Sequence, residues 1–354
     1  MNRIHIWLRA ETKNNEYRTP ITPTIAKKLL EHGYLITVEK SDTRCFKNEE
    51  YKIIGCQLAE PNSWPNALLD AYIIGLKELP KNIEIIKHKH IYFSHSFKNQ
   101  ENSKELIEKF VRGNGKILDL EYLVDDNGMR LTSFGKSAGI AGALLSLMAW
   151  IEQKITNNNA YLRELIPFSD TNNIVDSIFN KLATINSQPN ILVVGSKGRV
   201  GTGVISILDR LNITPTAWTR HDTENKDYSS EILDYDILIN CINLDKKINP
   251  FITFGTIDDP NRKLTVCVDI SCDYLNPHNP LPIYNSATTF SNPVLNLRST
   301  KPYFDIVSID NLPSLLPVDS SIDFSNQLYP HLLNIEIFGE VWQRADKVFF
   351  DKSV

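Results

Sequence analysis

Short apolar runs alternate with amphipathic segments through the first 135 residues of the chain. The runs predict buried strands, and the segments with apolar residues three and four positions apart predict helices. In the helix expected over residues 22–32, Thr22 is placed to cap the N-terminus and Gly33 to end it. Strands are expected at residues 3–8, 34–38, 71–75, 91–93 and 116–118, and further helices at residues 48–54 and 103–112.

The later part of the chain opens on a segment that is apolar on nearly all sides, residues 138–153, which predicts a buried helix. Another helix is expected at residues 174–185, and strands at residues 191–194, 214–218, 237–240 and 264–270. The stretch 324–350 is helical in pattern, and we expect it to return to the first domain.

This alternation of strands and helices predicts an α/β protein with two Rossmann-like, doubly wound parallel-sheet domains and a cleft between them. Residues 1–135, together with about 320–354, are expected to form a substrate-side domain. Residues 136–319 are expected to form a dinucleotide-binding domain, because they contain the most distinctive motif of the sequence.

That motif is a glycine-rich turn between a predicted strand and a predicted helix. Gly195, Gly198 and Gly201 let the backbone turn sharply and approach an anion, which the N–H groups of the following helix can bind. The spacing Gly-x-x-Gly-x-x-Gly differs from the usual dinucleotide fingerprint, and ordinary tight connections also contain such glycines. The strand before the turn and the helix after it favour dinucleotide binding.

Composition narrows the class of protein. The 354 residues carry a net charge of −4, which argues against nucleic acid or an anionic membrane as the main partner. The N-terminus lacks the apolar core of a signal peptide, and the longest apolar stretch, residues 138–151, is shorter than a membrane span. The five cysteines lack the spacing of metal ligands, so we expect no metal and a reduced, cytoplasmic protein.

Polar residues follow several predicted strands, where such sheets bind their ligands. Lys77, beside Glu78, could act as a base if it loses solvent, although a loop lysine is usually solvated. His95 has the side chain best suited to proton transfer near neutral pH, but many loop histidines are structural. An acidic group is expected either at the nicotinamide end of the cofactor or in turn capping: Asp269, Ser271, Asp273 and Asp310.

Several motifs, in the same order along nearly the whole chain, resemble those of one family. This family is the NAD-dependent, lysine-forming saccharopine dehydrogenases, within the alanine dehydrogenase and transhydrogenase fold group. The matching motifs occupy residues 7–13, 73–78, 90–95, 119–121, 134–135, 138–139, 276–280 and 308–317.

The resemblance implies a reaction in which the secondary amine of saccharopine is oxidised to an imine, and water then releases lysine and 2-oxoglutarate. By the same resemblance Lys77 is the base for the amine and His95 the acid/base for imine hydrolysis. Lys13, Glu78 and Glu121 are implied to support these groups. The implied substrate-binding residues are Arg18 and Arg130, which bind carboxylates, and Gln100, Phe134, Ser271 and Asp273, which shape the pocket.

The cofactor positions match the family less well. A carboxylate is expected after the second strand of the dinucleotide domain, where it would bind the adenosine ribose, but Thr219 and then Arg220 stand there. We therefore expect NAD as cofactor, with NADP as a second possibility. The remaining expected cofactor-binding residues are Gly195, Gly198, Arg199, Gly201, Thr223, Asn243, Ile270, Ile309, Asp310, Asn311 and Leu312.

Two other functions stay open at this point. One is an opine-type dehydrogenase or imine reductase that uses another amino acid and keto acid. The other is a catalytically silent dinucleotide-binding protein, which the presence of both Lys77 and His95 argues against. For the leading function the partners are saccharopine, lysine and 2-oxoglutarate, with no nucleic acid and no membrane, and the resemblance implies a monomer.

Overall fold

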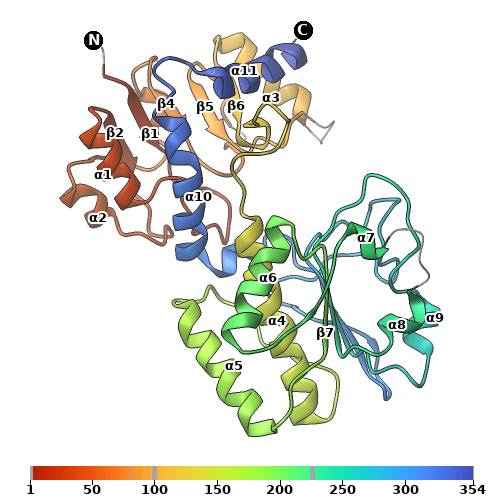
Figure 1. The fold of residues 1–354 in the computed structure, drawn as a ribbon. Helices are drawn as coiled ribbons and strands as arrows, with labels where there is room; N and C mark the ends of the chain where they lie inside the picture. Colours follow the sequence, from red (N-terminus) through yellow and green to blue (C-terminus); the bar gives the residue numbers. More distant parts are fainter. Residues whose placement is uncertain (1–2, 81, 98–101, 224–227, 354) are drawn as a thin grey trace. The chain divides into compact units, whose positions relative to one another are not determined.

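The computed structural model describes residues 3–80, 82–97, 102–223 and 228–353. The chain divides into two compact units (Figure 1). Unit 1 comprises Met1–Phe134 and Pro317–Val354, and unit 2 comprises Gly135–Leu316. Each unit contains its own six-stranded sheet with helices on both faces, so the predicted pair of doubly wound α/β domains is confirmed.

The sheet of unit 1 is parallel throughout, in the order β3-β2-β1-β4-β5-β6. Its two middle strands are almost wholly buried, in keeping with their mainly apolar sequences. The strands are β1 (His5–Leu8), β2 (Leu35–Glu39), β3 (Gln57–Ala59), β4 (Tyr72–Ile74), β5 (Lys89–Tyr92) and β6 (Lys116–Asp119).

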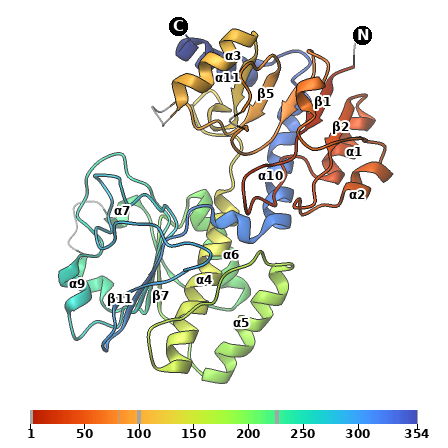
Figure 2. The ribbon, with the colours of Figure 1, turned by 180° about the vertical axis from the view of Figure 1, so that it is seen from behind.

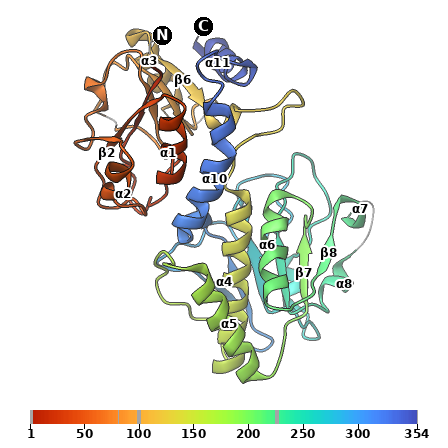
Figure 3. The same ribbon diagram turned by 60° about the vertical axis from the view of Figure 1, so that its left-hand side comes forward.

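Helices α1 (Pro23–Glu31) and α10 (Pro317–Leu332) cover one face of this sheet and lie beside each other (Figures 1 and 3). The Thr22 side chain caps α1 by accepting a hydrogen bond from the backbone of Ile25, as predicted. The other face packs against α3 (Ser103–Gly113). The short helices α2 (Asn48–Ile53), η1 (Trp64–Asn66) and η2 (Leu120–Tyr122) complete the connections.

The C-terminal segment packs within unit 1, where the Ser321 and Ser325 hydroxyls accept hydrogen bonds from the backbone N–H groups of Thr19 and Thr22. The stretch that is helical in pattern forms two helices, α10 and α11 (Glu340–Ser353). The chain turns between them at Phe338, whose φ of 46° no helix continues. Periodicity alone did not reveal this turn.

The sheet of unit 2 has the order β11-β12-β10-β9-β7-β8. Two of its strands, β7 and β11, are labelled in Figure 2. All of its pairs are parallel except the edge pair β11 and β12, which is antiparallel and which the sequence pattern did not predict. The strands are β7 (Ile191–Val194), β8 (Thr216–Trp218), β9 (Ile237–Asn240), β10 (Val266–Asp269), β11 (Leu295–Arg298) and β12 (Phe304–Val307).

One face of this sheet carries α4 (Gly135–Thr156), α5 (Thr171–Ile185) and α6 (Arg199–Arg210) (Figure 3). The opposite face carries the short helices α8 (Ser229–Ile232) and α9 (Phe254–Asp258). Two further short helices, α7 (Arg220–Thr223) and η3 (Leu312–Leu315), follow strands β8 and β12. Among the described residues no helix is long and apolar enough to cross a membrane.

Helices α4 and α6 pack closely against each other because each has a glycine at the contact. A Cβ atom built on Gly139 of α4 would lie 1.9 Å from the carbonyl oxygen of Val200 in α6. One built on Gly203 of α6 would lie 2.1 Å from the carbonyl oxygen of Lys136 in α4. Both distances are far below van der Waals contact, so only glycine permits this spacing. The contact fixes α6, whose N-terminus follows the glycine-rich turn.

Candidate active site

Three neighbouring parallel strands of unit 1 end at one edge of the sheet, and each is followed by a predicted catalytic or supporting residue. Lys77 follows β4, His95 follows β5 and Glu121 follows β6. The strand order reverses between β1 and β4, and ligands of doubly wound sheets bind at such a switch point. The topology therefore brings the predicted catalytic residues to the edge at which this fold class binds ligands.

The backbone around Lys77 is held by buried charged groups. The two carboxylate oxygens of Glu11 accept hydrogen bonds from the backbone N–H groups of Leu76, at 2.6 Å, and Lys77, at 3.0 Å. The buried guanidinium of Arg9 donates to the Lys77 carbonyl oxygen. Gly75 makes room for that guanidinium, because a Cβ there would lie 2.4 Å from Arg9 Nε. Arg9 and Glu11 thus fix where the Lys77 side chain begins.

The surroundings of Lys77 lower its pKa. Burial lowers the pKa of Lys77 from its ordinary value, and the cations Arg18 and Lys13 lower this pKa further. The carboxylates of Glu16 and Glu78 act in the opposite direction without cancelling the shift. A lysine with a lowered pKa is more often unprotonated near neutral pH, so it can accept a proton.

Beside Lys77 lies a buried ion pair that the sequence did not reveal. The Glu16 carboxylate accepts two hydrogen bonds from Arg18, at 2.7 Å from Nε and 2.5 Å from Nη2. Both residues are buried, and the guanidinium carbon lies 4.2 Å from the centre of the Phe134 ring. Burial opposes ionisation of Glu16, but the bonds and charge of Arg18 outweigh it and lower the Glu16 pKa. Glu16 therefore stays charged and orients Arg18.

His95 is exposed on a constrained turn after β5. Its backbone has a φ of 51°, and its ring stacks on Phe93 with 6.4 Å between the ring centres. The preceding residue is fixed by Asp119, whose carboxylate accepts hydrogen bonds from the Ser94 hydroxyl at 2.6 Å and the Ser94 nitrogen at 3.2 Å. His95 and Glu78 both line a cavity of about 400 Å³. The imidazole is thus open to water and to a small ligand.

The other predicted residues of unit 1 form two exposed ion pairs. Arg130 pairs with Glu121 at 2.8 Å, and Lys13 pairs with Glu78 at 3.6 Å. Glu121, implied by the resemblance to act on Lys77, thus has its closest described ionic contact with Arg130. Gln100, predicted to shape the substrate pocket, lies outside the described residues.

In unit 2 the glycine-rich turn has the geometry of a phosphate-binding loop. Gly195 has a φ of 83°, which residues with a side chain rarely adopt. A Cβ on Gly201 would lie 2.3 Å from the Gly195 carbonyl oxygen, so this glycine lets α6 start directly against the turn. Gly198 caps α6 without a side chain, and Arg199 is its exposed first residue. The N-terminal end of a helix suits a pyrophosphate.

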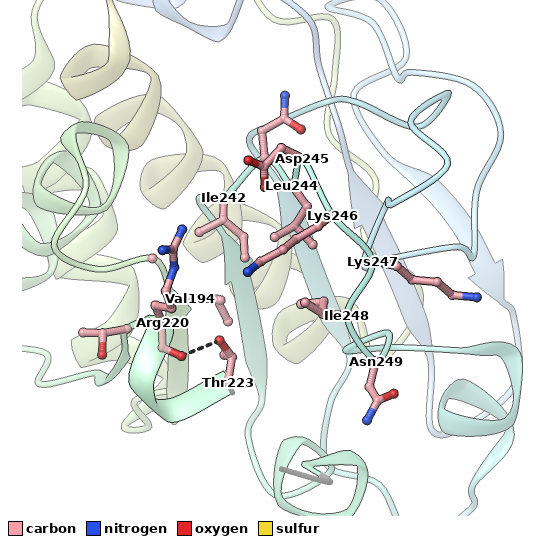
Figure 4. Close-up of a pocket in the computed structure, with 13 residues that line it drawn as sticks. Val194, Arg220, Thr223, Ile242, Leu244, Asp245, Lys246, Lys247, Ile248 and Asn249 are labelled. Carbon is pink, nitrogen blue, oxygen red and sulfur yellow. Dashed lines mark hydrogen bonds between the residues drawn. The ribbon is translucent and has the colours of Figure 1, made fainter. Parts of the chain in front are cut away.

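A cavity of about 720 Å³ opens at the carboxyl ends of β7, β8 and β9 (Figure 4). The strand order reverses between β7 and β9, so this cavity lies at the switch point of the second sheet. It brings together five of the predicted cofactor residues: Gly195, Thr219, Arg220, Thr223 and Asn243. Val194, Ile242 and the segment 244–249 form the rest of the described wall, and the sequence did not single out that segment.

The remaining predicted residues of unit 2 divide into two groups. The side chains of Ile270, Ile309 and Leu312 are buried in the hydrophobic core, which leaves only their backbone for a cofactor contact. The polar residues instead bond to near neighbours in the chain: the Ser271 hydroxyl donates to Asp269, Asp273 accepts from Asn276, and Asn311 donates to Ser314, while Asp310 is exposed.

Asp269 was expected either at the nicotinamide end of the cofactor or in turn capping, and the structure places it in a buried network. Its carboxylate accepts hydrogen bonds from Asn240 at 2.9 Å, Ser271 at 2.6 Å and Tyr284 at 2.5 Å. The side chain has no exposed surface. Asp269 therefore ties together the ends of neighbouring strands.

The chain has two doubly wound sheets. In one, a glycine-rich turn follows strand β7; in the other, a lysine follows β4 and a histidine follows β5. These features define the two-domain class of dinucleotide-dependent dehydrogenases. The saccharopine dehydrogenase (NAD+, L-lysine-forming) of Schizosaccharomyces pombe is 41% identical over 98% of this chain and 97% of the relative. The chain belongs to the saccharopine dehydrogenase (NAD+, L-lysine-forming) family, which confirms the resemblance seen in its motifs.

Other comparisons agree with this placement. The Yarrowia lipolytica protein of the same name is 40% identical over 99% of this chain and 98% of the relative. The family model described as alanine dehydrogenase/PNT, N-terminal domain, matches residues 7–141. A solved structure of L-alanine dehydrogenase has the same fold, with a TM-score of 0.69, 15% identity, and coverage of 98% of this chain and 93% of that chain.

Proposed function

We propose that the protein catalyses the reversible oxidative cleavage of L-saccharopine to L-lysine and 2-oxoglutarate, with hydride transfer to NAD. The observation that carries this proposal is Lys77, a lysine with a lowered pKa at the ligand-binding edge of unit 1, in a chain of this family. The glycine-rich turn and the cavity of unit 2 fit a dinucleotide, which supplies the hydride acceptor when bound.

Each proton transfer of this reaction has a residue suited to it. Before a hydride can leave the adjacent carbon, the secondary ammonium of saccharopine must lose a proton. The neutral Lys77 amine takes that proton, so the nitrogen lone pair becomes available to form the C=N bond. Water then attacks the imine carbon. His95, exposed at the same sheet edge, accepts a proton from this water and returns one to the departing lysine nitrogen.

The carboxylates of saccharopine meet cations at this edge. We propose that Arg18 and Arg130 bind them, since a guanidinium binds carboxylate through two parallel hydrogen bonds. Glu16 holds Arg18 in one orientation, and the Phe134 ring stacks against its guanidinium. Lys13 balances the charge of Glu78 near the reacting lysine.

The proposal is tested by following NADH oxidation with 2-oxoglutarate and lysine, and then with a panel of other amines. Turnover with lysine well above that with every other amine is the expected result. A strong preference for another amine would assign the protein to the opine-type or imine reductases. The absence of turnover with any amine, for a protein that still binds NADH, would favour a catalytically silent binding protein.

The pH dependence of kcat/KM for saccharopine should change when a charge near Lys77 is removed. Lys13→Met removes a cation near Lys77 and also frees the Glu78 carboxylate, and both changes raise the pKa of Lys77. Because Lys77 must be neutral to act, the acidic limb of log kcat/KM for saccharopine should move to higher pH. Lys40→Met is the matched control, since Lys40 is equally exposed in its ion pair with Glu60. An unmoved limb in Lys13→Met would remove Lys13 from the proton-transfer step.

We also propose that the protein acts as a monomer in the cytoplasm. The described cysteines are free thiols, which suits a reducing compartment. Light scattering on the purified protein should give the mass of one chain at micromolar concentration, and a dimer mass would contradict the monomer.

A further inference from the structure

The adenosine end of the dinucleotide site has an unusual charge for an enzyme expected to use NAD. The cavity at the ends of β7–β9 is lined by the cations Arg220, Lys246 and Lys247 and by one acidic residue, Asp245. In Figure 4, Lys246 extends toward the side of the cavity that Arg220 occupies, whereas Lys247 points away from it. The described lining therefore has an excess of positive charge.

The position after β8 lacks the acidic side chain that binds the ribose hydroxyls of NAD. An Asp or Glu there would accept hydrogen bonds from the ribose hydroxyls and would repel a 2′-phosphate. Thr219 occupies the position and is one of the residues that line the cavity. The usual reason for an enzyme to reject the phosphorylated cofactor is thus missing at this position.

The nearest acidic residue along the chain is already engaged. Asp222 accepts a hydrogen bond from the Thr219 nitrogen at 2.7 Å and another from the Thr219 hydroxyl at 2.8 Å. These bonds lower the pKa of Asp222 and hold its carboxylate against the turn. Asp222 is absent from the described lining of the cavity, and its carboxylate is bonded back to the turn by Thr219.

We propose that this cavity binds the 2′-phosphate of NADP, with Arg220 and Lys246 as its cationic partners, so that the enzyme accepts NADP as well as NAD. The inference rests on the proposed function, because it refines the cofactor of that reaction. A phosphate monoester carries about −1.5 to −2 charge at neutral pH and accepts hydrogen bonds on three oxygens. Arginine binds such a group through two parallel hydrogen bonds and lysine binds it as a point charge.

The direct test compares two ligands that differ only in the 2′-phosphate: 2′,5′-ADP and 5′-AMP, titrated into the full-length protein by calorimetry. We expect 2′,5′-ADP to bind at least as tightly as 5′-AMP. Binding of 5′-AMP more than about tenfold tighter, or about 1.4 kcal/mol, would overturn the inference while leaving a dinucleotide site intact. Binding of neither ligand, nor of NADH, would contradict the proposed function itself.

Single substitutions test whether Arg220 and Lys246 bind the 2′-phosphate. Arg220→Ala and Lys246→Ala should each weaken 2′,5′-ADP binding about tenfold and change 5′-AMP binding less than about threefold. Lys263→Ala is the matched control, because it removes the same charge from an exposed lysine that pairs with Asp234 and is absent from the cavity lining. Equal losses for both ligands, or none, would overturn the assignment of these residues.

Restoring the acidic residue should reverse the preference. Thr219→Asp should favour 5′-AMP over 2′,5′-ADP by more than tenfold, since it adds a ribose acceptor and repels the phosphate. In turnover, the unaltered enzyme should use NADPH with a kcat/KM within about a hundredfold of that with NADH, or about 2.7 kcal/mol. A larger preference for NADH would contradict relaxed cofactor use.

Discussion

Replacing Lys77 with methionine should lower kcat for saccharopine oxidation by about a thousandfold, within the range typical of a lost general base. Methionine keeps much of the length and apolar stem of lysine but has no group that accepts a proton. The backbone at this position is held by Arg9 and Glu11, so the loop should keep its conformation. Saccharopine oxidation by the Lys77→Met variant, followed at 340 nm across pH, is the measurement.

The control separates loss of the base from loss of a positive charge. Lys87→Met removes an exposed lysine from the same unit and should leave kcat within about twofold. Lys77→Met should also keep its affinity for NADH and its thermal unfolding midpoint. If kcat falls less than about tenfold while the pH profile is unchanged, Lys77 is not the base.

Gly139→Ala should destabilise unit 2 by about 3 kcal/mol, at the upper end of the usual cost of overpacking a core. The added methyl would lie 1.9 Å from the Val200 carbonyl oxygen and 2.9 Å from the Val204 nitrogen. Since both are backbone atoms of α6, the two helices must separate to accommodate it. The shift of the urea midpoint, followed by fluorescence and circular dichroism, measures the effect.

Gly255→Ala is the matched control for this prediction. It is also a helical glycine of unit 2, but its added methyl would meet nothing nearer than 3.6 Å. Alanine in a helix is favoured over glycine by about 1 kcal/mol, so this variant should be unchanged or slightly more stable. Equal midpoints for the two variants would show that α4 and α6 are not held together closely at Gly139.

Local pattern was sufficient for most of the fold, because strands such as β1, β7 and β9 are short, mainly apolar runs. It failed for β12, which carries a charged residue at its centre. Asp305 is buried there because Asn159, Asn296 and the Ala160 nitrogen donate hydrogen bonds to it. Asn159 and Ala160 lie 146 and 145 residues from Asp305, so no window around β12 could reveal that they satisfy the charge.

The same limit applies to the candidate site. Lys77 and His95 could be found because they directly follow strands, and a parallel sheet brings strand ends together. Glu16 could not, since its importance comes from burial against Arg18, and a Glu two residues before an Arg is unremarkable in a polar segment. The sequence pattern did not single out the cations of segment 244–249 for a similar reason. Only the folded loop brings Lys246 to the same cavity as the turn after β8.

The glycine contact between α4 and α6 also restricts how this sequence can diverge. At Gly139 and at Gly203 an added methyl would meet the main chain of the other helix rather than a side chain. A mutation that shortens a neighbouring side chain therefore creates no space for it, and the two positions cannot compensate for each other. Drift in cofactor choice can proceed through Thr219, Arg220 and Lys246, whereas the helix pair behind the phosphate turn should remain fixed in any functional descendant.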